Sequence, residues 1–192
     1  MNKAYMSIIE QMKEQGIVFR EQVTPAQLDE AEIRYGIRFP EELRSFYELA
    51  MPISNGFVNW LDDSPENVEL IQKRLSFPVR GVLTAVELEE IWPSVWGICP
   101  PDEEQAVEIA KERMKGAALL IPVYLHRYVP YLEGVVDPPV LSVYGGDIIY
   151  YGFSLENWLR IEFCDPSDSF WQEQKKKDVS IPEIPGWQEL IG

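Results

Sequence analysis

Few residues of this chain are suited to covalent or metal chemistry. Its two cysteines, Cys99 and Cys164, are too few for a disulfide framework or a four-cysteine zinc site. Such low cysteine usage favours a reducing, cytoplasmic location. Cys99 lies in a loop rich in Trp and Pro, where a buried, inert thiol is expected and a reactive thiol is the alternative. The single histidine, His126, could act as a general base or metal ligand, but its position between an apolar run and Arg127 favours a structural role at a strand end.

The usual catalytic and phosphate-binding motifs are missing as well. The chain has no G-x-S-x-G nucleophile elbow, and Gly145-Gly146 lacks the spacing of a phosphate-binding loop. Carboxylates cluster at Asp62-Asp63 and at 102–104, where they could bind a cation or act as acid and base. Both clusters lie at expected helix starts, where the helix dipole favours acidic residues for structural reasons. The sequence therefore predicts a protein without catalytic residues, metal or cofactor.

Basic residues are scarce, with 17 Lys and Arg against 32 Asp and Glu and a net charge of −15. Such a field repels nucleic acid and anionic membranes and attracts a basic protein. On charge alone, however, a charge that only maintains solubility is the favoured reading. No apolar run reaches membrane-spanning length, and the first residues alternate between apolar and charged types. We therefore expect neither a transmembrane helix nor a signal peptide.

The clearest local signals lie in residues 24–60. Thr24, Pro25 and Gln27 have the spacing of a capping box with proline at the first helical position, and Gly36 is a typical helix stop. A second helix is expected from Pro40 onward. Its apolar stripe consists of Leu43, Phe46, Tyr47 and Ala50. The link between the two helices is short, so we expect them to pack close together.

The rest of the chain changes from helical to strand periodicity. Further helices are expected at 5–15, 65–77, 84–92, 102–116 and 154–163. Strands are expected at 79–83, 118–125, 127–132, 140–144 and 147–151, the last two forming a hairpin. Pro78 is expected to break the third helix, and Pro122 indicates an edge strand or a bulge. Residues 184–191 are expected to dock back through Trp187 and Leu190. This order of elements predicts an α+β fold.

Two blocks of sequence resemble the SMI1/KNR4 family of the SUKH superfamily. The first block contains GIRFP at 36–40, Leu43, Phe46-Tyr47 and Asn55-Gly56. The second contains His126-Arg127-Tyr128, Pro130, PVLSVY at 139–144, DIIYYG at 147–152 and Trp158-Leu159, and it is similar to the bacterial branch of the family. The resemblance covers residues 24–163. It departs from the family pattern in the segment at about 62–95 and in the Gly-Gly turn before Asp147.

The resemblance implies both a fold and a function. It implies one domain over residues 1–192, with N-terminal helices on a central, mostly antiparallel sheet and a C-terminal helix. Beyond the family pattern, the chain is expected to have an inserted helical segment at about 62–95 and a polar tail from about 165. Bacterial members are similar to immunity proteins, which neutralise toxins deployed against neighbouring cells, often nucleases. The expected partner is therefore a basic toxin domain. A regulatory scaffold, as in fungal relatives, is the alternative, and an enzyme ranks last.

The partner-binding surface is expected where tryptophan and negative charge occur together. Tryptophan is enriched at interaction hot spots, although packing in the core explains Trp92 and Trp96 equally well. The predicted patch consists of Trp60, Asp62, Asp63, Trp92 and Trp96.

Overall fold

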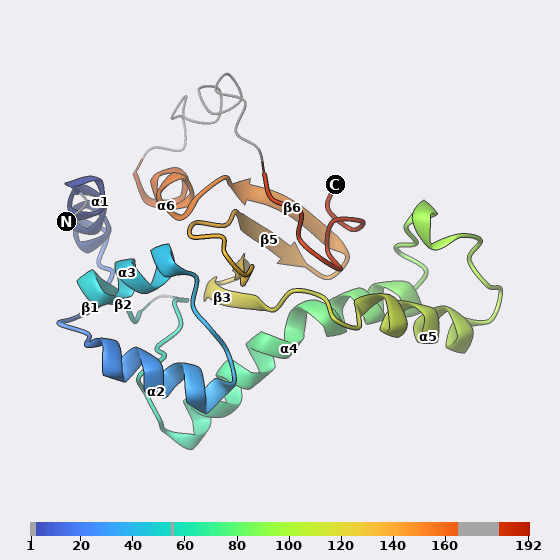
Figure 1. Cartoon of the computed structure of the whole chain (residues 1–192), viewed down its shortest axis with the longest axis horizontal. Coiled ribbons are helices and arrows are strands. Elements are labelled where there is room, and N and C mark those ends of the chain that lie inside the picture. Colours follow the sequence, from blue (N-terminus) through green and yellow to red (C-terminus); the bar gives the residue numbers. More distant parts are fainter. Residues whose placement is uncertain (1–2, 55, 165–180) are drawn as a thin grey trace.

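The computed structural model describes residues 3–54, 56–164 and 181–192 and has an α+β fold, as predicted. Helices surround a four-stranded antiparallel sheet, and a second antiparallel sheet of two short strands lies near the N-terminal helices (Figure 1). The residues at 165–180, which include most of the predicted polar tail, lie outside the described part, as does Asn55 of the predicted Asn55-Gly56 turn. In the described ranges, no helix is long and apolar enough to cross a membrane.

The N-terminal elements follow the predicted capping signals. They are α1 (Lys3–Glu14), β1 (Phe19–Glu21), α2 (Pro25–Tyr35), α3 (Glu41–Leu49) and β2 (Ala50–Pro52). The Thr24 hydroxyl accepts a hydrogen bond from the Gln27 amide, and the Gln27 side chain accepts one from the Thr24 amide, which completes the capping box. Gly36 has a φ of 64°, in the left-handed region that favours glycine at a helix end.

The prediction for residues 65–92 is wrong in one respect. In place of two helices and a strand, a single helix, α4 (Pro65–Glu87), continues through Pro78. Proline has no amide hydrogen, so the carbonyl of Arg74, four residues earlier, loses its partner within the helix. The Tyr128 hydroxyl donates to this carbonyl at 3.3 Å. Val82, Ala85 and Val86 then pack into the core, and this burial outweighs the cost of the proline.

We expect Tyr128→Phe to lower the free energy of unfolding by about 1–2 kcal/mol, because the Arg74 carbonyl is left without a donor. Pro78→Ala restores the helical amide, so the same Tyr128→Phe change should cost less in the Pro78→Ala background. A double-mutant cycle measured by urea unfolding gives the coupling between the two residues. Equal costs of Tyr128→Phe in both backgrounds would contradict this account of the proline.

The central sheet has the strand order β3-β4-β5-β6. Its strands are β3 (Leu120–Tyr124), β4 (Arg127–Pro130), β5 (Val140–Tyr144) and β6 (Asp147–Gly152). β3 is an edge strand, and its register with β4 shifts between Pro122 and Tyr124, so both readings of Pro122 are confirmed. The predicted hairpin is also confirmed, because Tyr144 pairs with Asp147 across the two glycines.

The two faces of the sheet belong to two hydrophobic clusters, because successive side chains of a strand point to opposite faces. On one face, Ile121 and Val129 pack with the N-terminal helices and with α6 (Leu155–Phe163). On the other, Leu120 and Tyr128 pack with α4 and with α5 (Glu103–Met114). The predicted packing of helices on a mostly antiparallel sheet is confirmed. Helix α4, within the segment interpreted as an insertion, forms part of the second core.

The C-terminal segment docks as predicted. The buried Trp187 donates through its indole Nε1 to the Ala118 carbonyl at 2.7 Å. Ile191 forms a parallel bridge with Ile148, and the Gly192 amide donates to the Ile148 carbonyl at 3.0 Å. The segment thereby covers part of the β6 edge, which would otherwise expose unpaired backbone groups.

Candidate functional site

The three predicted site tryptophans have structural positions. Trp60 is 0% exposed, and its Nε1 donates to the Tyr47 hydroxyl at 3.3 Å. Trp96 is buried and donates to the Glu189 carboxylate at 2.6 Å. Trp92 is partly buried, packs edge-to-face on Trp96 and donates to the Gly97 carbonyl at 2.9 Å. These contacts assign the tryptophans to packing, and Trp60 in particular offers no surface to a partner.

The predicted patch is not one surface. Asp62 and Asp63 immediately precede α4, whereas Trp92 and Trp96 follow its far end. With 23 residues, α4 is about 33 Å long. Asp62 accepts a hydrogen bond from the Ser64 amide at 3.0 Å, so its role is local. The interpretation of these five residues as a combined acidic and aromatic site is therefore corrected.

The other candidate groups are dispersed. Asp102 caps α5 by accepting from the Gln105 amide at 2.9 Å, which confirms the structural reading of the acids at 102–104. Cys99 is exposed rather than buried, because its loop projects beyond the ends of α4 and α5 (Figure 1). His126 lies in the turn between β3 and β4, at a strand end as predicted. The described residues contain no group of three or more His, Cys, Asp or Glu that could hold a metal ion.

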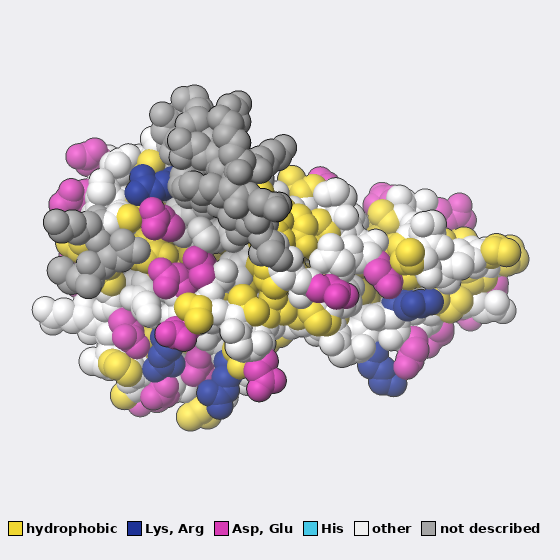
Figure 2. Space-filling model, turned by 45° about the horizontal axis from the view of Figure 1, so that its top comes forward, with side chains coloured by type: hydrophobic (Ala, Val, Ile, Leu, Met, Phe, Trp, Pro, Cys, Tyr) yellow, Lys and Arg dark blue, Asp and Glu magenta, His cyan; other side chains and the backbone are white. Residues whose placement is uncertain are grey.

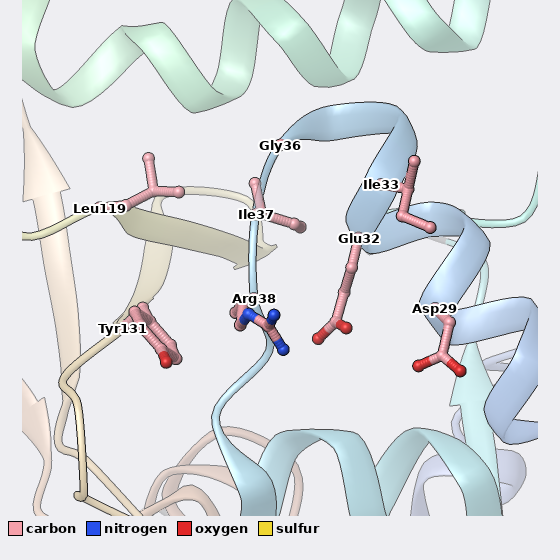
Figure 3. Close-up of a pocket in the computed structure, with 8 residues that line it drawn as sticks. All are labelled: Asp29, Glu32, Ile33, Gly36, Ile37, Arg38, Leu119 and Tyr131. Carbon is pink, nitrogen blue, oxygen red and sulfur yellow. The ribbon is translucent and has the colours of Figure 1, made fainter.

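A concave surface lies away from these candidate residues, at the link between α2 and α3. We call it the link groove, and it has a volume of about 710 Å³. It is lined by Asp29, Glu32, Ile33, Gly36, Ile37, Arg38, Leu119 and Tyr131 (Figure 3). An adjoining hollow of about 450 Å³ shares Asp29, Glu32, Arg38 and Tyr131 and extends to Val136. The groove thus joins part of the family-like block at 36–40 to residues flanking β3 and β4.

Aliphatic side chains are exposed in the link groove. Ile33 is 82% exposed and Leu119 is 37% exposed, on opposite sides of the groove (Figure 3). Ile33 is about 140° around the helix from Leu28, which begins the buried stripe of α2. A large aliphatic side chain on the solvent face of a helix gains nothing from folding, so the position is open to a partner.

The acids of the groove are held by one arginine. Arg44 on α3 contacts Asp29 at 2.7 Å and Glu32 at 3.2 Å, and it pairs with Glu48 at 3.4 Å. Partial burial lowers the pKa of Arg44, but the three carboxylates outweigh this effect and raise the pKa overall. Glu32 also accepts from the Phe39 amide at 2.7 Å. The acidic wall is therefore fixed in position before any partner binds.

Arg38 completes the rim of the groove. Its exposed side chain lies between the Tyr131 ring and the Glu32 carboxylate (Figure 3). Within the described ranges, no ion pair joins Arg38 to a carboxylate. A fixed acidic wall, a free cation and exposed aliphatic groups are features suited to binding a protein surface.

Comparisons with protein-family models, with curated proteins and with solved structures found no match.

Proposed function

We propose that the chain is a non-enzymatic, cytoplasmic protein-binding module that uses the link groove to bind a basic protein. The observation that carries the proposal is the exposed Ile33, which lies beside the preorganised acids of α2. Apolar contacts surrounded by a polar rim are typical of protein interfaces. The net charge of −15 would accelerate association with a basic partner.

The kind of partner follows from the resemblance to SMI1/KNR4 proteins. Bacterial members of that family are similar to immunity proteins, so we propose a basic toxin domain, such as a nuclease, as the partner. Acidic side chains are spread over the face seen in Figure 2 rather than gathered in one patch. Overall charge therefore accounts for long-range attraction, whereas the groove provides the local contacts. A regulatory scaffold without a toxin partner is the second candidate.

We expect Ile33→Arg to weaken binding of the proposed basic toxin domain, sought among the products of neighbouring genes, by about tenfold or more, because it places a cation against the basic partner. The measurements are growth rescue on co-expression with the toxin and the Kd of the purified pair. Because Ile33 is exposed, the substitution should leave the fold intact.

Leu70→Arg is the matched control. Leu70 is an exposed aliphatic residue on α4, and it does not line the link groove. Equal losses in both variants would exclude the groove and leave only a general charge effect. A failure of every neighbouring toxin domain to bind at low salt would overturn the immunity function. Recovery of a housekeeping partner without toxin protection would favour the scaffold.

A further inference from the structure

Cations gather in a second groove, at the opposite side of the sheet from α6. We call it the α4 groove, and its volume is about 380 Å³. It is lined by Lys73, Arg74, Phe77, Arg80, Leu125, His126, Tyr128 and Tyr144. A neighbouring hollow of about 430 Å³ shares Phe77, Arg80 and Tyr144. Both volumes lie in the usual range for small-molecule sites, which is about 300–1,000 Å³.

The positive charge of this groove is largely uncompensated. Across the described ranges, Arg74 and Arg80 form no ion pair with a carboxylate, whereas Lys73 pairs with Glu69 at 2.5 Å. Burial and the nearby Arg127 lower the pKa of His126, so this ring adds no positive charge at neutral pH. Such an arrangement is unexpected in a chain with 32 acidic and 17 basic residues. Among the described residues, no acid lines the α4 groove itself, and Glu90 lines only the neighbouring hollow. Cations that converge in this way favour an anionic ligand.

Two hydrogen bonds fix the Arg74 guanidinium in place and leave some of its N–H donors unused. It donates to the Gly56 carbonyl at 3.0 Å and to the Leu125 carbonyl at 2.6 Å. Guanidinium carries five N–H donors, so these two bonds leave most of them available. Desolvation lowers the pKa of Arg74, since burial disfavours its charged form. A partly buried, rigid guanidinium without a counter-charge is suited to a phosphate group.

An aromatic wall lies beside these cations. Tyr144 at the end of β5 is 71% exposed, and the His126 ring packs against it with a centroid distance of 6.1 Å. The turn after Tyr144 touches α4 directly, since a Cβ atom added at Gly81 would lie 3.2 Å from the Gly145 Cα. This close approach of two glycines sets the distance between the helix and the ring. The exposed ring offers a face on which a flat group can stack.

We infer that the α4 groove binds a nucleoside phosphate, with the phosphates on Arg74 and Arg80 and the base against Tyr144. The inference is independent of the link groove and of the proposed partner. A small ligand is favoured over an acidic peptide because rigid donors and an exposed ring lie together in a groove of small-molecule size. Phosphate supplies the charge that these donors lack, and stacking supplies the apolar contact.

The test is calorimetric titration of the full chain with ATP at low salt, with adenosine and inorganic phosphate as partial ligands. We expect ATP to bind more tightly than either part alone. Arg80→Glu should weaken ATP binding by at least about tenfold, since it replaces an attractive charge with a repulsive one. Tyr144→Ala should weaken ATP binding by several-fold and leave phosphate binding unchanged, because it removes only the stacking surface.

Arg113→Glu is the matched control. Arg113 is an exposed arginine on α5 without an ion pair in the described part of the chain. Its replacement by glutamate changes the net charge by the same amount as Arg80→Glu. Circular dichroism confirms that each variant is folded. The inference is overturned if ATP does not bind, if Arg80→Glu and Arg113→Glu weaken ATP binding equally, or if a poly-glutamate peptide binds while ATP does not.

Discussion

Replacing Trp60 with alanine is expected to lower the free energy of unfolding by about 3–5 kcal/mol, the usual cost of truncating a fully buried tryptophan. Its side chain is 0% exposed. Alanine removes the whole ring and leaves a cavity that the surrounding elements can close only in part. Because a domain is typically stable by about 5–15 kcal/mol, this single change would remove a large share of the total.

The surroundings of Trp60 explain the size of the expected effect. Its ring lies edge-on to Phe39 at 5.1 Å and to Tyr35 at 5.5 Å between centroids. Phe39 in turn packs at right angles on Tyr47, whose hydroxyl accepts the Trp60 indole hydrogen bond. Such aromatic pairs contribute about 0.5–1.5 kcal/mol each beyond the area they bury. Losing Trp60 also leaves the buried Tyr47 hydroxyl without this donor.

Urea unfolding followed by far-ultraviolet circular dichroism measures the effect without relying on tryptophan fluorescence. Trp92→Ala is the control, because Trp92 is only partly buried and lies in the loop beyond α4. We expect the control to cost clearly less than Trp60→Ala. If the two variants were equally stable, Trp60 would not be the centre of the aromatic core.

Trp60 also shows why a binding site is harder to predict than a fold. Tryptophan is common both in cores and at hot spots, and a sequence does not distinguish the two. The neighbours that decide the matter, Tyr35, Phe39 and Tyr47, come from α2, the link and α3. The apolar periodicity of α2 and α3 predicted the two helices correctly. It did not show that the chain after α3 brings Trp60 back into the same core.

Helix α4 shows that local sequence rules can also fail for the fold itself. Local rules correctly predicted its start at Ser64-Pro65 and placed a break at Pro78. The break does not occur because residues beyond Pro78 are buried in the core and because the Tyr128 hydroxyl satisfies the Arg74 carbonyl from 54 residues away. Caps and turns were predictable since their partners lie within a few residues. A compensation supplied by a distant strand leaves no mark in the local pattern.

The link groove was only partly visible in the sequence. Ile33 carried a signal, because it is an isoleucine on the polar side of an amphipathic helix. Leu119 and Tyr131 carried none, since each flanks a strand and reaches the groove only through the pairing of β3 with β4. The apolar positions that build the sheet could be read from periodicity, whereas the residues that meet at its edge depend on tertiary structure.

Asp137 is expected to make stability depend on pH. Its carboxylate accepts from the Leu155 amide at 2.9 Å, at the first residue of α6. Burial raises the pKa of Asp137 to about 6, and repulsion from Glu42 and Glu156 adds to the rise, while the Leu155 hydrogen bond opposes it. Ionising Asp137 in the folded state is therefore costly, even though a helix N-terminus favours an anion.

The sign of the effect follows from proton binding. With a folded pKa of about 6 and an ordinary value of 3.8, the folded state holds this proton more tightly than the unfolded state. The stabilisation is complete below the unfolded pKa and is lost as pH rises through the folded pKa. A difference of about two pKa units corresponds to roughly 3 kcal/mol, lost between pH values of about 4 and about 7.

Asp137→Asn isolates this contribution, because the amide keeps an oxygen that can accept from the Leu155 amide and cannot ionise. The free energy of unfolding of both proteins is measured by urea titration across that pH range. We expect the wild type to lose roughly 3 kcal/mol relative to Asp137→Asn as pH rises, since the other carboxylates titrate in both proteins and cancel in the difference. Parallel pH profiles would show that Asp137 ionises at an ordinary pKa. A wild type that gains stability relative to the variant would mean that the Leu155 amide and the α6 dipole outweigh burial and the neighbouring acids.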